Sequence, residues 1–256
     1  MQAEILIEAR DVMLRYATGT EALTSFSLVS RRREFVSIVG PSGCGKSTFL
    51  RLAAGLLPPT SGVLHVGGVP PSAAGRAHCE TAFVFQFPTL LPWRSVEDNV
   101  ALPFELGATP SPRDEARLRT LLELVGLAPF ANAMPHELSG GMQMRASLAR
   151  ALITRPELIL LDEPFGALDD ITRQRLNEDL LTLWQQDRWS ALFVTHNVFE
   201  AAFMSERVLV MSARPGRVVA EFAVPFPFPR AAALRAAPAF AELTGRISAA
   251  LREAST

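Results

Sequence analysis

Lysine, cysteine and long apolar runs are scarce in this 256-residue chain. The two cysteines, Cys44 and Cys79, are too few for a disulfide framework and are typical of a reducing cytosol. No apolar run approaches the roughly 18 residues that a membrane-spanning helix needs. The formal net charge of −1 gives no overall field that would attract a nucleic acid, so we expect no nucleic acid partner.

The remaining composition predicts one large folded domain over residues 1–256. Hydrophobic residues make up 48% of the chain and charged residues 20%, which excludes a disordered chain. A chain of this length buries a sizeable core. The first residues include Glu4 and Glu8 and lack a basic leader followed by an apolar stretch, so we expect no secretory signal.

The single lysine lies in a complete phosphate-binding motif. Of the 25 basic residues, one is Lys46 and the other 24 are arginines. A lysine ammonium is a compact point charge, whereas arginine is a planar fork, so the lone lysine indicates a role that arginine cannot fill. It stands in Gly40-Pro-Ser-Gly-Cys-Gly-Lys-Ser-Thr48, which matches G-x4-G-K-[ST]. An apolar run at 34–39 precedes the motif and a helical pattern at 48–56 follows it, as a strand–loop–helix unit requires.

This loop predicts how a nucleotide is held. Backbone amides at the start of the helix wrap the β-phosphate, Lys46 reaches the β- and γ-oxygens, and Ser47 ligates Mg²⁺. Because the same amides favour an anion, we expect Cys44 to lean towards its thiolate; the alternative is a small apolar filler. The predicted nucleotide contacts of the loop are Gly40, Pro41, Ser42, Gly43, Cys44, Gly45, Lys46, Ser47 and Thr48.

A second motif follows the aliphatic run at 158–161, which predicts a buried strand. Asp162 emerges at the carboxyl end of that strand, where open α/β sheets bind ligands, and is expected to hold Mg²⁺ through water. Glu163 is placed to orient and polarise the attacking water. Such a pair is usually only a strand end that meets solvent, but the upstream phosphate-binding loop favours the catalytic interpretation.

A third motif is Leu138-Ser-Gly-Gly-Met-Gln143, which precedes a helical pattern. Ser139 is a good helix N-cap, and the two glycines remove side chains from the approach to that helix end. The motif therefore predicts either an ordinary capped helix or a second phosphate site formed by bare backbone amides.

With these three motifs the chain resembles the ATP-binding subunit of ABC transporters over nearly its whole length. Residues 138–143 resemble the family's signature sequence, with Met142 where the commonest form has Gln. The resemblance implies that Gln86 touches Mg²⁺ and water, that His196 contacts the γ-phosphate, and that Tyr16 stacks on adenine. Taken singly, a histidine after a strand or a lone tyrosine is usually structural, but the collinear order of all the motifs favours function.

The resemblance also implies that two chains sandwich two ATP molecules head to tail, with Mg²⁺. Residues 167–169 resemble the D-loop at the dimer interface, and Asn197 stands where Asp is usual. The implied catalytic residues are Glu163, His196 and Gln86, and the implied Mg²⁺ ligands are Ser47, Gln86 and Asp162. The residues implied to contact the ATP of the opposite subunit are Ser139, Gly140, Gly141, Gln143 and Asp169.

The expected fold is α/β: a P-loop NTPase core of mostly parallel sheet with flanking helices, an N-terminal antiparallel β layer, and an inserted helical lobe. The core comprises 1–86 and 155–256, and the lobe 87–154. The expected strands of the β layer are 4–9, 12–16, 25–29 and 62–66. In the lobe, Ser95 with Asp98 begins one helix, and 111–114 begins another that Gly126 closes. A short strand pair and an Arg/Ala-rich terminal helix are expected after Ser212.

The function implied is that of an ATPase powering an importer, peripheral at the cytoplasmic face of the inner or plasma membrane. Residues 87–100 and 212–218 resemble the branch for nitrate, sulfonates, taurine and related solutes. The alternative is the ATPase of an exporter or another membrane complex. A GTPase is excluded because its Asn-Lys-x-Asp motif needs a second lysine.

The expected partners are a second copy, transmembrane permease subunits and, indirectly, a solute-binding protein. Two prolines keep the apolar stretch 87–93 out of a sheet or helix interior. It is expected either to receive a short permease helix or to plug the seam between core and lobe. The residues expected to touch the permease are Phe87, Leu90, Leu91 and Trp93.

Overall fold

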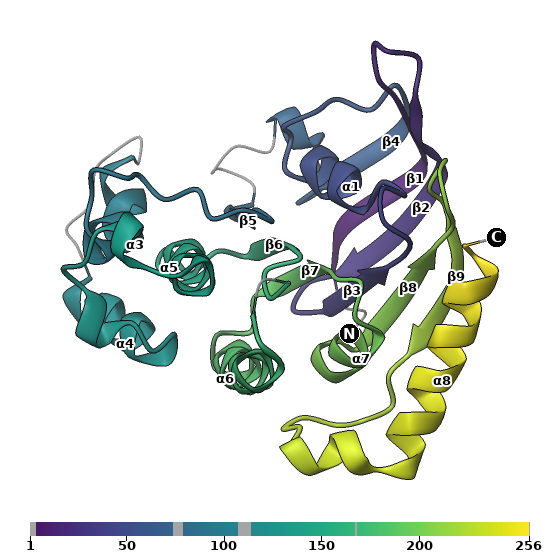
Figure 1. Ribbon diagram of the computed structural model, residues 1–256. Helices are drawn as coiled ribbons and strands as arrows, with labels where there is room; N and C mark the ends of the chain where they lie inside the picture. Colours follow the sequence, from purple (N-terminus) through teal and green to yellow (C-terminus); the bar gives the residue numbers. More distant parts are fainter. Residues whose placement is uncertain (1–3, 74–78, 107–113, 167, 256) are drawn as a thin grey trace.

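The computed structural model describes residues 4–73, 79–106, 114–166 and 168–255 (Figure 1). Its central element is a six-stranded sheet in the order β5-β6-β7-β3-β8-β9. All neighbours in this sheet are parallel except the last pair, β8 and β9. Strands β3, β6 and β7 are buried along their whole length, which explains their continuous apolar runs. The strands are β3 (Phe35–Val39), β5 (Thr81–Val84), β6 (Leu158–Asp162), β7 (Ser190–Val194), β8 (Arg207–Met211) and β9 (Val218–Ala223).

The N-terminal layer is a second, antiparallel sheet in the order β2-β1-β4. It confirms the expected β layer, with β1 at Ile5–Arg15, β2 at Glu21–Arg31 and β4 at Ser61–Val66. The expectation of separate strands at 4–9 and 12–16 was wrong, because both belong to β1. Its register with β4 shifts next to Asp11, whose φ of 48° is accommodated within the strand. A side chain on Gly62 would lie 2.3 Å from the Asp11 carbonyl oxygen, so the bulge needs glycine opposite it.

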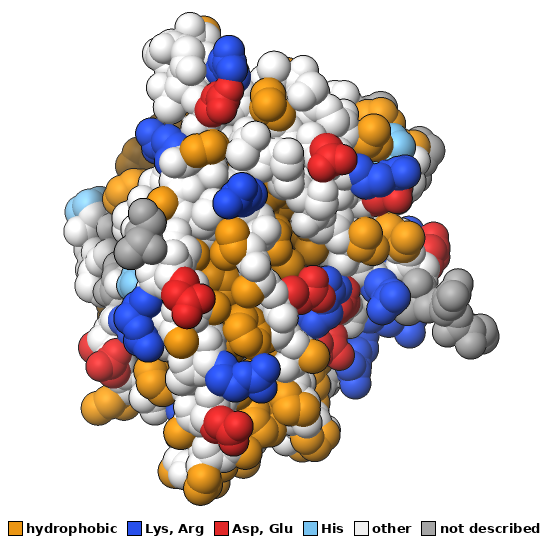
Figure 2. Space-filling model, turned by 90° about the vertical axis from the view of Figure 1, so that its right-hand side faces the viewer, with side chains coloured by type: hydrophobic (Ala, Val, Ile, Leu, Met, Phe, Trp, Pro, Cys, Tyr) orange, Lys and Arg blue, Asp and Glu red, His pale blue; other side chains and the backbone are white. Residues whose placement is uncertain are grey.

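Helices cover both faces of the central sheet. Helix α1 (Lys46–Ala53) packs between the two sheets, while α6 (Asp170–Asp187) and α7 (Val198–Met204) cover the opposite face. Helix α8 (Pro238–Glu253) inserts Phe240, Leu243 and Ile247 into the same core as α7. Figure 2 shows the side of the molecule that carries β9 and α8, where hydrophobic side chains gather in a band between charged ones. Short 3-10 turns lie at Pro71–Ala73, Ala128–Phe130, Pro135–Glu137 and Ala232–Ala236.

The inserted segment is helical, as expected. It contains α3 (Val96–Glu105), α4 (Glu115–Leu124) and α5 (Gly140–Leu152). Ser95 caps α3 by accepting a hydrogen bond from the Asp98 amide at 3.1 Å, and Asp114 caps α4 through the Arg117 amide at 2.9 Å. Residues 111–113 of the expected helix start lie outside the described part. Gly126, with φ of 66°, follows the end of α4 as predicted.

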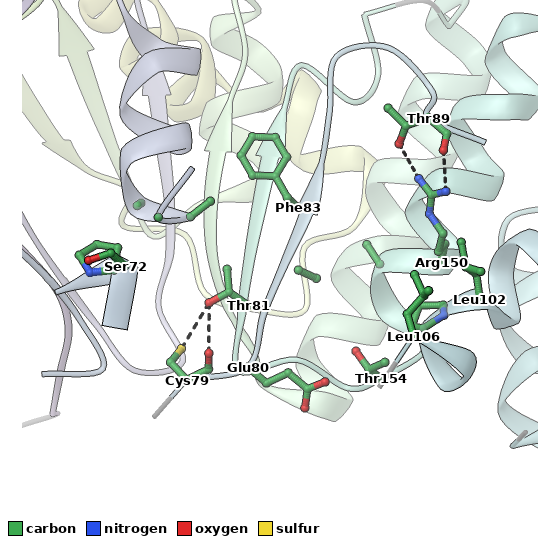
Figure 3. A pocket seen from close by; sticks show the side chains of 17 residues that line it. Ser72, Cys79, Glu80, Thr81, Phe83, Thr89, Leu102, Leu106, Arg150 and Thr154 are labelled. Atoms are coloured by element: carbon green, nitrogen blue, oxygen red, sulfur yellow. Dashed lines mark hydrogen bonds between the residues drawn. The ribbon is translucent and has the colours of Figure 1, made fainter. Parts of the chain in front are cut away.

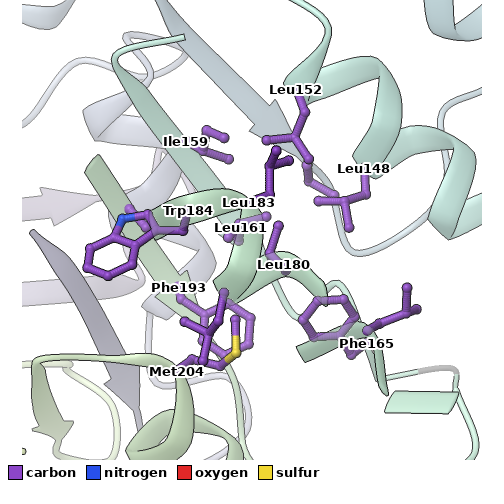
Figure 4. Packing of buried hydrophobic residues seen from close by; sticks show 14 of the residues in the cluster. Leu148, Leu152, Ile159, Leu161, Phe165, Leu180, Leu183, Trp184, Phe193 and Met204 are labelled. Atoms are coloured by element: carbon purple, nitrogen blue, oxygen red, sulfur yellow. The ribbon is translucent and has the colours of Figure 1, made fainter. Parts of the chain in front are cut away.

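Helix α5 joins the inserted segment to the core. Its residues Leu148 and Leu152 belong to the same hydrophobic cluster as Ile159 and Leu161 of β6 (Figure 4). That cluster also takes in Leu121 of α4, so the lobe and one face of the sheet share a continuous core. The lobe boundary at 154/155 stays a prediction. The expectation of a strand pair after Ser212 was wrong, because only β9 follows Ser212 in the described residues and it pairs with β8, which precedes Ser212. Within the described ranges, no helix combines the length and the apolar character that membrane crossing requires.

Candidate nucleotide site

The site forms where four parallel strands end at one edge of the sheet. In the order β5-β6-β7-β3, Gln86 follows β5, Asp162 ends β6 with Glu163 next to it, His196 follows β7, and Gly40 follows β3. Carboxyl ends of parallel strands meet at a single edge, which is where open α/β folds bind ligands. The topology therefore brings together residues that are far apart in the sequence.

The loop from Gly40 to Gly45 curls tightly between β3 and α1. A side chain on Gly40 would lie 2.8 Å from Cys44 Sγ, and one on Gly45 would lie 2.7 Å from the Ala22 carbonyl oxygen. Gly45 also has a φ of 109°, which side chains rarely adopt. Inside the curl, Lys46 Nζ donates to the carbonyl oxygens of Gly40 at 2.8 Å and Pro41 at 2.9 Å. Lys46 is only 5% exposed, so its ammonium is enclosed by the loop.

Ser47 and Asp162 form a pair of oxygen ligands beside this loop. Ser47 Oγ donates to Asp162 Oδ1 at 2.7 Å, and Asp162 is 2% exposed. Burial raises the pKa of Asp162, and the hydrogen bond from Ser47 opposes that shift. A hydroxyl and a carboxylate are the hard oxygen donors that Mg²⁺ prefers, usually together with substrate phosphates. The pair therefore fits a Mg²⁺ ion that would bridge to a nucleotide.

Glu163 and His196 meet next to this pair. Glu163 Oε2 lies 3.0 Å from His196 Nδ1. Glu163 has a φ of 47°, and its amide donates to the Val194 carbonyl at 2.9 Å, so the chain turns sharply as it leaves β6. A non-glycine residue held at positive φ costs about 1–3 kcal/mol, and such strain concentrates at functional sites. The turn directs the Glu163 carboxylate towards the end of β7.

The segment that carries His196 is fixed by a small network. Thr195 Oγ1 donates to Glu200 Oε2 at 2.5 Å and accepts from the Asn197 amide at 3.0 Å. Asn197 in turn caps α7 by accepting from the Glu200 amide at 3.1 Å. Asparagine thus performs the capping that an aspartate would perform, and the departure from the usual pattern leaves the segment intact. The backbone on both sides of His196 is held while its ring is exposed.

The structure bears differently on the predictions for Tyr16 and for Cys44. The Tyr16 hydroxyl lies 3.0 Å from Thr48 Oγ1, which places the chain's only tyrosine beside the first turn of α1. Its stacking on adenine stays a prediction. The expectation of a Cys44 thiolate was wrong, because burial raises the pKa of the thiol and outweighs the neighbouring ammonium of Lys46. Cys44 is 1% exposed and contributes to the core below the loop, which supports the alternative of an apolar filler.

The signature residues lie at the start of α5, apart from α1 (Figure 1). Ser139 caps the helix by accepting from the Met142 amide at 3.3 Å, and a side chain on Gly140 would meet nothing within 4 Å. The start of α5 is therefore capped by Ser139, and the space beside Gly140 is free of neighbouring atoms among the described residues. Gln143 Nε2 donates to the carbonyls of Pro135 at 3.0 Å and Leu138 at 3.3 Å, so it braces its own chain, which the sequence pattern did not indicate.

The contacts of Asp169 and Gln86 with a nucleotide stay predictions. Asp169 caps α6 by accepting from the Thr172 amide at 3.0 Å, while Ala167 lies outside the described residues. Gln86 is exposed just after β5.

The sequence did not indicate a role for Arg173. Its guanidinium donates to the carbonyls of Phe165 at 3.2 Å and Leu168 at 2.6 Å and so holds the loop after Glu163. An arginine at the start of a helix gives no distinctive signal.

A groove of 660 Å³ lies between the end of α1, β5 and the helical lobe (Figure 3). Arg150 lines one side of it and donates to the Thr89 carbonyl at 2.7 Å and the Thr89 hydroxyl at 2.6 Å. The groove is lined by Thr89 and not by the four apolar residues expected to touch the permease. Polar and apolar lining residues include Ser72, Thr81, Phe83, Leu102, Leu106 and Arg150.

The four apolar residues divide into two kinds. Phe87 is 75% exposed and Trp93 is 69% exposed. Leu90 packs against the core of the lobe, and the amide of half-buried Leu91 donates to Asn99 Oδ1 at 2.7 Å. Leu90 is thus partly buried against the core, as the seam alternative expects, while Phe87 and Trp93 face outward. Contact of this stretch with a permease stays a prediction.

Fold and site together define a P-loop nucleotide-binding protein. The sequence profile of the ABC transporter family matches residues 23–166. The taurine import ATP-binding protein of Rhizobium johnstonii is 44% identical over 93% of this chain and 91% of that protein. The nitrate import ATP-binding protein of Synechococcus elongatus is 42% identical over 82% of this chain and 76% of its own length. The chain belongs to the ABC transporter family.

A solved structure shows the same fold. The dimeric structure of an ATP-binding cassette in a post-hydrolysis state, bound to ADP and Pi, superposes with a TM-score of 0.77. The two sequences are 31% identical, and the superposed region covers 87% of this chain and 100% of the solved chain. The α/β architecture described above is thus that of an ABC ATP-binding cassette.

Proposed function

We propose that this chain is the ATP-hydrolysing subunit of an ABC importer for a small solute such as taurine, nitrate or a related sulfonate. The 3.0 Å contact between Glu163 and His196, beside the Ser47–Asp162 pair, carries the proposal because it assembles the groups that hydrolysis needs. The import functions of the relatives at 44% and 42% identity support the direction of transport and the class of solute.

Binding begins with the loop around Lys46. The backbone amides at the start of α1 receive the β-phosphate, and the glycines allow the close approach. Lys46 Nζ exchanges its contacts with the Gly40 and Pro41 carbonyls for the β- and γ-oxygens. Ser47, Asp162 and Gln86 would hold Mg²⁺, which neutralises charge on the phosphates when bound. Tyr16, whose hydroxyl lies 3.0 Å from Thr48 Oγ1, would stack on the adenine.

Hydrolysis is carried out by Glu163 and His196. The Glu163 carboxylate orients a water molecule and accepts its proton as the water oxygen bonds to the γ-phosphorus and the bond to ADP breaks. His196 contacts that carboxylate through Nδ1. An imidazolium, which donates from both ring nitrogens, would also donate from Nε2 to the γ-phosphate. Because Thr195 and Asn197 hold the backbone around His196, the ring projects from a fixed base.

The second phosphate contact comes from another copy of the chain. The open, capped start of α5 offers Ser139 and bare amides to an anion, but it lies apart from the chain's own loop. A head-to-tail pair would bring Gly140, Gly141 and Asp169 of one subunit to the ATP of the other. The ADP-bound relative is itself a dimer, which supports this arrangement. Gln143 contributes by bracing the loop before the helix.

The groove beside β5 suits a permease helix. Its volume of 660 Å³ and mixed lining suit a short amphipathic segment. Thr89, which lines the groove, lies between the exposed Phe87 and Trp93 in the sequence, and these two side chains would serve as anchors. The subunit would then work at the cytoplasmic face of the membrane, and a solute-binding protein would deliver the solute to the permease.

Two measurements test the proposal. Purified chain should release phosphate from MgATP, and Lys46→Ala should abolish nucleotide binding without unfolding the protein. Co-purification with its permease and solute-binding protein, followed by mass spectrometry of the bound ligand, should identify a small anionic or zwitterionic solute. Absence of ATP hydrolysis by the assembled complex would overturn the proposal.

A further inference from the structure

Arg214, in the connection between β8 and β9, grips the phosphate-binding loop from outside. Its Nη2 donates to the Gly43 carbonyl oxygen at 2.9 Å, and its Nε donates to the same oxygen at 3.1 Å. Gly43 has a φ of 73°. A side chain on Gly43 would find one described atom beyond its chain neighbours within 4 Å, and that atom is Arg214 Nη2 at 3.4 Å. The guanidinium is thus the group that restrains this flexible position.

The connection that presents Arg214 is itself closely held. The Ser212 hydroxyl donates to the Pro215 carbonyl at 3.1 Å and accepts from the Arg217 amide at 3.2 Å, which closes the turn. The Ala213 amide donates to the Ala254 carbonyl at 2.8 Å, so the residue that ends α8 supports the turn from behind. Arg214 therefore projects from a fixed base, although its own side chain is exposed.

Gly216 sets the distance between this connection and the loop. Its amide donates to the Ala22 carbonyl at 3.0 Å, and its carbonyl accepts from the Thr24 amide at 3.1 Å, so it is joined to β2. A side chain at this position would lie 2.0 Å from the Cys44 carbonyl oxygen. The close approach is possible only because residue 216 is glycine. It brings the turn into contact with the residue that follows Gly43.

Two cations therefore hold the carbonyls of the loop from opposite sides. Lys46 holds Gly40 and Pro41 from within, and Arg214 holds Gly43 from outside. The amides of such a loop bind an anion only while its carbonyls point away from the ligand. When Lys46 turns to the phosphates, its two carbonyls are released, but the contact between Arg214 and Gly43 is compatible with a bound nucleotide.

We propose that Arg214 is a positioning residue for nucleotide binding, which keeps the Gly43 peptide turned outward and the loop in its anion-binding curl. The inference rests on the proposed ATP binding and adds to it a residue outside the phosphate-binding motif. Through Ala213 and Ala254, the same turn links the loop to the end of α8.

Arg217 provides a matched control. It lies in the same turn, carries the same charge and is exposed, and it lines a hollow of 510 Å³ beside α8 and not the phosphate-binding loop. If Arg214 acted only by adding positive charge near the phosphates, Arg217→Ala would have a comparable effect. A positioning role predicts that the two variants differ.

The experiment compares Arg214→Ala, Arg214→Lys and Arg217→Ala with the wild type in MgATP binding, KM, kcat and melting temperature. Arg214→Ala should weaken MgATP binding and raise KM by about fivefold to tenfold, the effect of losing a charged hydrogen bond at a solvent-exposed site. Its kcat at saturating ATP should stay within about twofold, because Glu163 and His196 are untouched. Arg214→Lys should recover part of the loss with its single ammonium.

Several results would overturn the inference: equal KM for Arg214→Ala and the wild type, equal losses for Arg214→Ala and Arg217→Ala, or a fall in melting temperature that accounts for the lost binding. Measurements at about 50 and 300 mM salt add a separate criterion, since a long-range charge effect disappears with screening and a positioning effect persists. If neither the wild type nor Lys46→Ala binds MgATP, the result contradicts the proposed function and not the role of Arg214 within it.

Discussion

Glu163 Oε2 lies 3.0 Å from His196 Nδ1, although the two residues are separated by 33 positions and belong to the ends of neighbouring strands β6 and β7. A histidine that holds a carboxylate at this distance fixes its direction without blocking its second oxygen. In the proposed hydrolysis the pair would separate two tasks: His196 would orient the carboxylate, and Glu163 would act on water.

Glu163→Gln should retain MgATP binding and lose hydrolysis. The amide keeps the shape of the side chain but cannot accept a proton, so phosphate release should fall by at least about 100-fold, within the usual range for a general base. The bound ATP should then trap a dimer that size-exclusion chromatography detects. His196→Ala is the comparison, since it removes the orienting group and leaves the base. Hydrolysis by Glu163→Gln at the wild-type rate would show that another group activates the water.

Exposed and partly buried residues of the stretch 87–93 should respond differently to replacement by aspartate. Trp93 is 69% exposed, so Trp93→Asp should melt at the wild-type temperature and hydrolyse ATP as an isolated subunit, yet fail to co-purify with the permease. Leu90 is partly buried against the core, so Leu90→Asp should place a carboxylate in a partly apolar contact and lower the free energy of unfolding by about 1–3 kcal/mol. Thermal melts and co-purification of both variants separate these effects. Normal assembly of Trp93→Asp with the permease would remove this surface from the interface.

The central strands and the motif positions were predictable because each depends on local sequence. Buried parallel strands require continuous apolar runs, and the run before Asp162 is such a strand over its whole length. The helix starts at Ser95 and Ser139 were visible because a capping side chain acts within three residues. The expected break between residues 9 and 12 was wrong because a polar residue in a β-bulge gives the same sequence signal as a turn.

Contacts between distant segments gave no comparable signal. Arg214 and Gly43 are 171 positions apart, and Gln143 was assigned to a partner's ATP although it also braces its own chain. The Cys44 thiolate was wrong for a similar reason: the helix amides are local, but the packing that buries the thiol comes from other strands. A motif therefore predicts where such a residue lies in the chain, and packing between distant segments decides its pKa and its contacts.

Glu200 should make the stability of the protein depend on pH. Burial raises the pKa of this carboxyl, and the hydrogen bond from Thr195 and the nearby Asn177 oppose that shift. Glu200 Oε1 and Asn177 Oδ1 each lack a close hydrogen-bond partner among the described residues. A group whose folded pKa is raised contributes stability at low pH that is lost as pH rises through that pKa. Glu200→Gln keeps an acceptor for Thr195 and adds a donor suited to Asn177.

The Glu200→Gln variant should therefore gain melting temperature relative to the wild type as the pH is raised from about 5 to 8. Near the lower value the wild-type carboxyl is closer to its neutral form, and the two proteins should differ least. Thr195→Val is the comparison, because it removes the hydroxyl that donates to Glu200 and should destabilise the protein most when the carboxylate is charged. A Gln variant that melts below the wild type by the same margin at every pH would contradict a raised pKa.

Cys44 should be unreactive at neutral pH despite its place in the phosphate-binding loop. The thiol is 1% exposed and burial raises its pKa, so both access and thiolate fraction are low. In a Cys79→Ser background, which leaves Cys44 as the single thiol, alkylation followed by mass spectrometry should be much slower than that of free cysteine at pH 7.5. Its rate should climb only at pH values above the ordinary cysteine range, and unfolding in guanidinium should restore full reactivity. Rapid neutral-pH alkylation that ATP suppresses would instead place a thiolate at the phosphates.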